Sequence, residues 1–126
     1  GKIVAVLGVS FKPNTDDMRD SVALDVIPAL QEAGAIVQAF DPVAMEEAAK
    51  LLPNVNWMKE TYETLQDASV AVILTEWNEF RALDFEQVKQ VMKEPVLVDL
   101  RNVYKPEEMK KTGFAYSSIG RSKSVV

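Results

Sequence analysis

The 126-residue sequence predicts a single α/β domain built on a doubly wound parallel sheet of about six strands. Two observations support this prediction. Short apolar runs alternate with segments of helical periodicity along the whole chain, and the loops between them are short. The composition, with 48% apolar and 26% charged residues, is that of a globular protein able to form a core without disulfides or metals.

The first predicted unit is a strand followed by a long loop and a helix. IVAVL, residues 3–7, is a continuous apolar run, as expected of a strand that is buried on both faces. Asp20 or Ser21 is a suitable N-cap for a helix that ends at Gly34. Pro28 lies inside this helix and should kink it or make it locally irregular.

Two further units follow. AIVQAF, residues 35–40, reads as a strand that stops at Asp41-Pro42. A helix over about 43–52 ends before Pro53, and NVNWM, residues 54–58, predicts a short third strand. Residues 60–68 complete the unit as a short helix.

The second half repeats the alternation. SVAVILTEW, residues 69–77, gives the strongest strand signal after the first strand, and Asp84 can cap a helix that reaches about Lys93. VLVDL, residues 96–100, is the fifth strand. A short helix beginning at Pro106 or Glu107 and a last strand over 114–120 complete a Rossmann-like, doubly wound order.

Composition limits the chemistry that this chain can perform. It has no cysteine and no histidine, which excludes disulfides, thiolate metal sites and a catalytic thiol. A formal charge of -5 argues against nucleic acid and anionic membranes as partners, although a local basic pocket can exist in an acidic protein. No apolar run approaches the roughly 20 residues of a membrane span, and no secretory leader is visible, so we expect a cytoplasmic protein.

The chain starts abruptly with strand-like sequence, which suggests that it is a fragment of a longer protein. We expect one domain over residues 1–121 and a polar tail over 122–126.

The loop after the first strand, GVSFKPNTDDMRD over residues 8–20, carries more chemistry than a turn needs. In doubly wound sheets, ligands bind beyond the carboxyl ends of the strands, near the point where the strand order reverses. The loop lacks the G-x-G-x-x-G pattern of a dinucleotide site. Asp41 stands where a ribose-binding acid would, but we interpret it as a turn residue.

Asp16 and Asp17 raise the alternative of a metal or phospho-acceptor site in a receiver-like module, because adjacent acids suit Mg²⁺. No acceptor aspartate follows the third strand, however. We therefore expect the two acids to shape the loop through bonds to the backbone, or to hold Arg19 by an ion pair.

Basic residues at the strand ends favour an anion site instead. Lys12 and Arg19 lie in the opening loop, and Arg101 follows the fifth strand directly. Arginine suits bidentate phosphate recognition and lysine supplies a compact charge, so the three could hold a diphosphate. Arg101 could equally form a salt bridge with Asp99. The aromatic rings of Trp77 and Phe80 are more typical of a core or an interface than of a base-stacking platform.

Five motifs in order carry a resemblance that covers nearly the whole chain: FKPNTDDMRDS, AFDP, ILTEWNEF, VDLRN and YSSIGR. Together they resemble the C-terminal, UDP-binding domain of the UDP-glucose 6-dehydrogenase family, within the wider UDP-glucose and GDP-mannose dehydrogenases. The resemblance implies a parent with an N-terminal NAD-binding domain and a central helical domain that carries dimer contacts, and hence a homo-oligomer. It implies two NAD⁺-dependent oxidations, from UDP-glucose to UDP-glucuronate, through a thiohemiacetal and a thioester on a cysteine.

That cysteine and the NAD-binding domain are absent here, so the resemblance implies that this fragment alone is inactive. It assigns Phe11 and Lys12 to contacts with the sugar nucleotide, and Arg101 to substrate binding. Arg19 matches an arginine that reaches towards NAD in the other domain. The sequence departs from the family at Val22, where proline is usual, and at Leu100, where glycine is common.

Alternatives stay open at this point. The parent could act on another sugar nucleotide, GDP-mannose or UDP-N-acetylmannosamine, because residues outside the chain recognise the sugar. The domain could also be a non-catalytic regulatory or oligomerisation module with a receiver-like sheet. A third interpretation is an interface domain that docks another domain or subunit through the TEWNEF aromatics.

Overall fold

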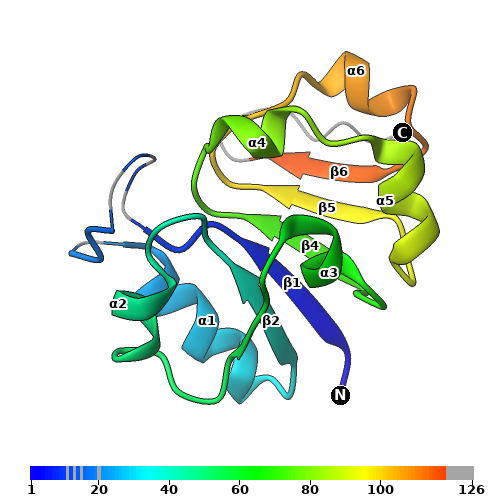
Figure 1. Cartoon of the computed structure of the whole chain (residues 1–126). Helices are drawn as coiled ribbons and strands as arrows, with labels where there is room; N and C mark the ends of the chain where they lie inside the picture. Colours follow the sequence, from blue (N-terminus) through cyan, green and yellow to red (C-terminus); the bar gives the residue numbers. More distant parts are fainter. Residues whose placement is uncertain (11, 13, 15, 20, 119–126) are drawn as a thin grey trace.

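The computed structural model describes residues 1–10, 12, 14, 16–19 and 21–118. Six parallel strands form one sheet in the order β3-β2-β1-β4-β5-β6, with helices packed on both faces (Figure 1). This is the predicted doubly wound, Rossmann-like α/β fold. The strands are β1 Ile3–Leu7, β2 Ile36–Phe40, β3 Asn56–Trp57, β4 Val70–Ile73, β5 Val96–Asp99 and β6 Ala115–Ser118. The helices are α1 Ala23–Glu32, α2 Met45–Ala49, α3 Thr61–Leu65, α4 Asn78–Arg81, α5 Phe85–Val91 and α6 Pro106–Lys110.

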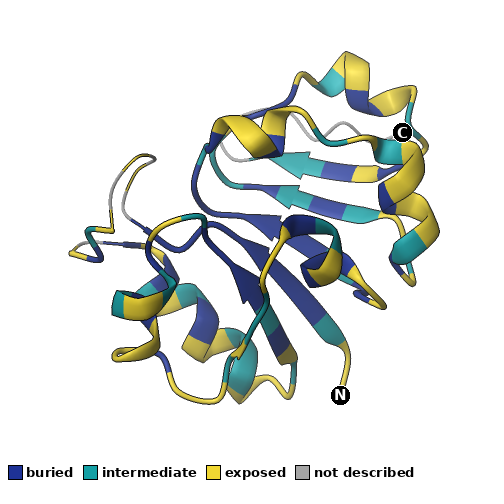
Figure 2. Ribbon diagram, in the orientation of Figure 1, coloured by how far each residue is buried: buried dark blue, intermediate teal, exposed yellow. Residues whose placement is uncertain are grey.

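The strand β1 lies at the centre of the sheet and separates two hydrophobic clusters. Its alternate side chains point to opposite faces, as the period of a strand requires. Val4 and Val6 pack with α1 and α2, whereas Ala5 and Leu7 belong to the cluster that α3 to α6 cover. The continuous apolar run of β1 is therefore explained by burial on both faces, which Figure 2 shows as dark blue central strands.

The segment after β4 differs from the prediction. The strand ends at Ile73, so the predicted strand 69–77 is too long at its carboxyl end. The chain then leaves the sheet and forms α4, a single turn that the sequence did not predict because it is too short to show helical periodicity. The residues 75–77 are consequently a loop at the carboxyl edge of the sheet.

Helix starts follow the expected cap chemistry only in part. The carboxylate of Asp84 accepts the backbone N–H groups of Glu86 and Gln87, which confirms it as the N-cap of α5. The helix α1 begins at Ala23, whose N–H donates to the Ser21 hydroxyl, and it runs on through Pro28. The other predicted cap, Asp20, lies outside the described residues.

The end of the chain is described only in part. The predicted last strand 114–120 is observed as β6 up to Ser118, and residues 119–126, which include the predicted tail 122–126, lie outside the described part. Among the helices that the structure describes, none is long and apolar enough to cross a membrane.

Candidate functional site

Loops that carry the candidate site residues follow four neighbouring strands at one edge of the sheet. The strands β2, β1, β4 and β5 are adjacent and parallel, so their carboxyl ends lie side by side (Figure 1). The strand order reverses between β1 and β4, and this is where doubly wound sheets bind ligands. The geometry of these loops therefore decides what the domain can bind.

The loops after β1 and β4 approach each other very closely. Gly8 has a φ of +84°, and a Cβ at this position would lie 2.5 Å from the Cβ of Thr75. The Thr75 hydroxyl donates a hydrogen bond of 2.8 Å to the carbonyl oxygen of Ser10. Only glycine allows both this backbone conformation and this contact. Gly8 therefore lets the loops after β1 and β4 approach each other closely.

Asp41 is fully buried and organises three of the loops. One carboxylate oxygen accepts the N–H groups of Val43 and Ala44 at 2.9 and 2.8 Å, which confirms its interpretation as a turn residue. The other oxygen accepts the N–H of Val9 at 2.8 Å and the indole N–H of Trp77 at 3.3 Å. The acid is therefore buried, and both of its oxygens are bonded within the protein. The helix α2 begins at Met45, two residues later than predicted.

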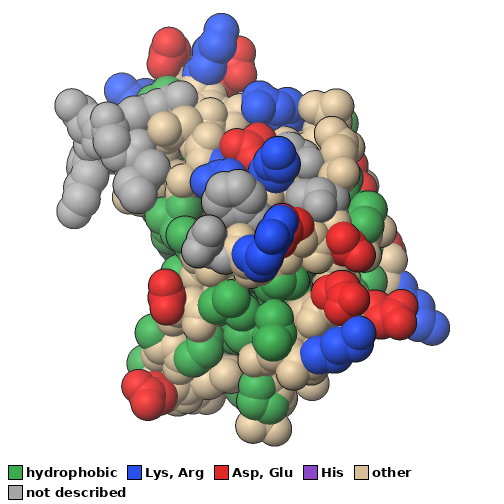
Figure 3. All heavy atoms as spheres, turned by 90° about the vertical axis from the view of Figure 1, so that its left-hand side faces the viewer, with side chains coloured by type: hydrophobic (Ala, Val, Ile, Leu, Met, Phe, Trp, Pro, Cys, Tyr) green, Lys and Arg blue, Asp and Glu red, His purple; other side chains and the backbone are tan. Residues whose placement is uncertain are grey.

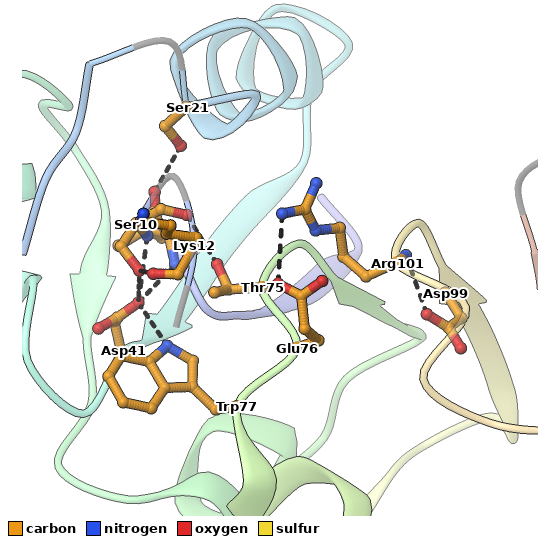
Figure 4. Close-up of polar contacts among 10 residues, drawn as sticks. Ser10, Lys12, Ser21, Asp41, Thr75, Glu76, Trp77, Asp99 and Arg101 are labelled. Atoms are coloured by element: carbon orange, nitrogen blue, oxygen red, sulfur yellow. Dashed lines mark hydrogen bonds and ion pairs between the residues drawn. The ribbon is translucent and has the colours of Figure 1, made fainter. Parts of the chain in front are cut away.

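Lys12 is exposed in the opening loop, close to this buried network. The Ser10 hydroxyl donates to the carbonyl oxygen of Lys12 at 2.9 Å, and the backbone N–H of Ser10 donates to Asp41 at 3.2 Å (Figure 4). The backbone at Lys12 is thus tied to the ends of β1 and β2, beside the switch point. Phe11, the other predicted residue of this motif, lies outside the described residues.

Arg101 reaches from the end of β5 to the loop after β4. Its Nη2 lies 3.2 Å from the Glu76 Oε1, and both side chains are about one-third exposed (30% and 31%). The alternative of a salt bridge to Asp99 is wrong. Asp99 accepts the backbone N–H of Arg101 at 3.1 Å instead, while the guanidinium extends towards Glu76 (Figure 4).

Asp99 anchors the β5 loop from inside the protein. It is fully buried, and its Oδ2 accepts the backbone N–H of Tyr104 at 3.0 Å and the hydroxyl of Tyr116 at 2.7 Å. The Tyr104 hydroxyl donates to the carbonyl oxygen of Phe80 and so joins this loop to α4. Burial, together with the charge of Asp99, raises the pKa of Tyr104 well above its ordinary value. The Tyr104 hydroxyl therefore serves as a neutral structural donor.

Arg19 lies apart from these groups, on the side of α1 and α2. It forms a surface ion pair with Asp17, with Nη2 2.9 Å from Oδ2, and its backbone N–H also donates to Asp17 at 2.9 Å. This contact confirms the expected pairing of the acid with Arg19. The hydrogen bonds from Arg19 lower the pKa of Asp17 from 3.8 to about 2. The part of the chain that the structure describes contains no group of three or more acids that could hold a metal.

A hollow of about 660 Å³ lies next to this ion pair, between the opening loop, α1 and α2. Figure 3 looks at this side of the molecule, where hydrophobic side chains gather and charged ones border them. The hollow is lined by Asp16, Asp17, Met18, Arg19, Leu24, Glu47, Lys50 and Leu51. Arg19 thus lines a surface on the side of α1 and α2, whereas the Arg101 guanidinium lies beside Glu76 in the loop after β4.

Two residues at this edge, Thr75 and Glu76, are not indicated by the sequence pattern as site residues. Both fall inside the predicted strand 69–77, although polar residues directly after an apolar run signal a strand end. Trp77 and Phe80 are 8% and 0% exposed, which confirms them as core aromatics. The indole of Trp77 also has a polar role, since it donates to Asp41.

Residues 5–106 match the model of the UDP-glucose/GDP-mannose dehydrogenase family, UDP binding domain. The chain belongs to this family. Its members are dehydrogenases, and the UDP-binding domain is the part that this chain represents.

Two curated relatives and one solved structure illustrate the match. The chain is similar to a UDP-glucose 6-dehydrogenase of Rhizobium meliloti (strain 1021), at 56% identity over 96% of this chain and 28% of that protein. It is also similar to the UDP-glucose 6-dehydrogenase TuaD of Bacillus subtilis (strain 168), at 43% identity over 96% of this chain and 26% of that protein. The crystal structure of an NDP-N-acetyl-D-galactosaminuronic acid dehydrogenase from Methanosarcina mazei Go1 matches with a TM-score of 0.84 at 29% identity, over 98% of this chain and 26% of that chain. The chain spans little more than a quarter of these relatives.

Proposed function

We propose that this domain binds the UDP part of a UDP-sugar at the carboxyl edge of its sheet, with Lys12 and Arg101 on the diphosphate. The observation that supports it best is the position of Arg101. In a domain of a UDP-binding family, its guanidinium is held at the end of β4, beside the switch point where ligands of this fold bind. Lys12 lies on the other side of the same switch point, at the end of β1.

The net negative charge of the chain makes these two cations important for binding a diphosphate. The chain carries a net charge of -5, so a diphosphate is repelled by most of the surface and attracted only where basic groups gather. Arginine offers a planar pair of donors to phosphate oxygens, and lysine offers a compact charge. Phe11 completes the proposed substrate contacts as an aromatic next to Lys12 in the motif.

The parent protein, in this proposal, is an NAD-dependent UDP-glucose 6-dehydrogenase that converts UDP-glucose to UDP-glucuronate in two oxidations. Residues 1–121 form its UDP-sugar-binding domain. An N-terminal domain binds NAD, Arg19 faces that cofactor, and a central helical domain supports a homo-oligomer in the cytoplasm. The catalytic cysteine belongs to another part of the parent, because this chain has none, so the chain alone should not turn over substrate.

The test is a titration of the ¹⁵N-labelled chain with UDP, followed by NMR. We expect shifts at the amides of Ser10, Glu76 and Arg101, and a rise in melting temperature that grows with UDP concentration, because a ligand that binds only the folded state stabilises it. The amides of α5, which lies away from the carboxyl ends of β1 and β4 (Figure 1), serve as internal controls. Shifts with GDP and none with millimolar UDP would refute the assignment of the nucleotide.

A further inference from the structure

Three consecutive residues after β4 each reach a different neighbouring loop. The Thr75 hydroxyl donates to Ser10 in the β1 loop at 2.8 Å. Glu76 pairs with Arg101 in the β5 loop at 3.2 Å. The indole of Trp77 donates to Asp41 at the end of β2 at 3.3 Å. The short loop at residues 75–77 therefore sets the positions of the other three loops at the carboxyl edge.

Thr75 and Trp77 are buried and contact structural groups, but Glu76 contacts a residue that the proposed function uses. Arg101 is fixed at two points. Its backbone N–H is held by the buried Asp99 at 3.1 Å, and its guanidinium is held by Glu76. A side chain with several rotatable bonds is thereby kept extended from β5 to the end of β4 (Figure 4).

We propose that Glu76 is a positioning residue that orients the Arg101 guanidinium for the diphosphate of the nucleotide. This inference rests on the proposed function and adds a residue to it. A guanidinium carries five N–H donors in one plane. A carboxylate that contacts Nη2 fixes the orientation of that plane, so the ligand meets an arginine that is already ordered.

Glu76 has two opposite effects on the affinity for the nucleotide, and their sizes decide which one prevails. Ordering a long side chain on binding costs free energy, and removing the residue that orders it in advance should weaken binding about threefold to tenfold. The negative charge of Glu76 repels a diphosphate, but this side chain is 31% exposed, so water and salt screen the repulsion. Positioning should therefore outweigh repulsion, and the loss of Glu76 should weaken binding.

The experiment measures the affinity of the chain for UDP and for inorganic pyrophosphate by NMR titration. We compare Glu76→Ala, which removes the contact, with Glu76→Gln, which keeps an acceptor oxygen for Arg101. The proposal predicts a threefold to tenfold loss for Glu76→Ala and less than a twofold loss for Glu76→Gln. Glu86→Ala, which removes an equally charged but 81% exposed side chain from α5, should leave both affinities unchanged.

A double-mutant cycle separates positioning from a general structural effect. The effect of Glu76→Ala should disappear in an Arg101→Gln background and persist in a Lys12→Gln background. Equal losses in both backgrounds, or tighter binding by Glu76→Ala, would overturn the proposal. If pyrophosphate binds but UDP does not, the nucleotide assignment fails, and Glu76 is judged on pyrophosphate alone. If neither ligand shifts Arg101 in the wild type, both proposals are wrong.

Discussion

Gly8 and Thr75 lie so close together that a methyl group on Gly8 would come within 2.5 Å of the Thr75 Cβ. These residues belong to the two central strand ends, β1 and β4, between which the strand order reverses. Thr75 is fully buried and also holds the carbonyl oxygen of Ser10. The carboxyl edge of the domain is thus built around a contact that only glycine permits.

Gly8→Ala should lower the free energy of unfolding by about 3 kcal/mol, because it adds a steric clash to a positive φ that alanine adopts poorly. Gly34→Ala is the matched control. Its φ of +94° is similar, but no atom lies within 4 Å of the added Cβ, so we expect a loss of only about 1 kcal/mol. Urea denaturation measures both values, and equal losses would show that the contact with Thr75 contributes nothing.

Asp41→Asn should destabilise the domain by about 3 kcal/mol, because an amide nitrogen would replace one of two buried oxygens that both accept hydrogen bonds from N–H groups. Asp25→Asn, on the exposed first turn of α1, should cost only about 0.5 kcal/mol. Chemical denaturation compares the two variants. A loss below 1 kcal/mol for Asp41→Asn would contradict its role in holding the loops together.

Asp17 should titrate with a pKa of about 2, well below its usual 3.8, because Arg19 donates hydrogen bonds to its charged form. A pKa that is lower in the folded state means that the ion pair stabilises the fold above about pH 4, and that this contribution is lost as the pH falls towards 2. Carboxyl ¹³C shifts measure the pKa directly.

Two variants check the cause of that shift. Arg19→Gln should return the pKa of Asp17 towards 3.8, whereas Lys12→Gln should move it much less, because Lys12 acts only through its charge and is the smallest contributor. The same change in both variants would mean that general charge, and not the hydrogen bonds from Arg19, sets the pKa.

Tyr116→Phe should cost about 2 kcal/mol of stability, because it removes a 2.7 Å hydrogen bond from the fully buried Asp99. Tyr62→Phe provides the comparison. The Tyr62 hydroxyl accepts the backbone N–H of Asp84 at a partly exposed site where water can replace it, so about 0.5 kcal/mol should be lost. Thermal unfolding of the two variants gives the difference, and similar melting temperatures would argue against Asp99 as the anchor of the β5 loop.

The sequence predicts the architecture well because the patterns that indicate strands and helices each lie within a short segment of the chain. Apolar runs such as IVAVL are buried on both faces of the sheet, and their alternation with helical segments implies parallel strands. The register of the strands and the pairing of the loops depend on contacts distant in sequence, which a local pattern does not contain. The helix α4 was missed for a related reason, since one turn held by the contact of Tyr104 with Phe80 has no periodicity of its own.

The cations of the candidate site can be predicted from the sequence, but the residues that pair with them cannot. The position of Arg101, directly after a buried strand, predicts it as a candidate site residue. Its ion-pair partner Glu76 is 25 residues away, and the neighbouring Asp99 was the natural but incorrect candidate. Asp99, two positions before Arg101, accepts the backbone N–H of Arg101. The long side chain of Arg101 carries its guanidinium to Glu76 in the neighbouring loop.

UDP binding at the carboxyl edge is tested most directly by calorimetric titration of UDP into the wild-type chain and into Lys12→Gln, Arg101→Gln and Lys50→Gln. Loss of a charge-assisted contact to a phosphate should weaken binding about tenfold or more in each of the first two variants. Lys50 is an exposed lysine on the α2 side, paired with Glu47 at 3.0 Å, so its variant should bind like the wild type. Equal affinities for all four proteins would contradict the proposal that the carboxyl edge binds the diphosphate.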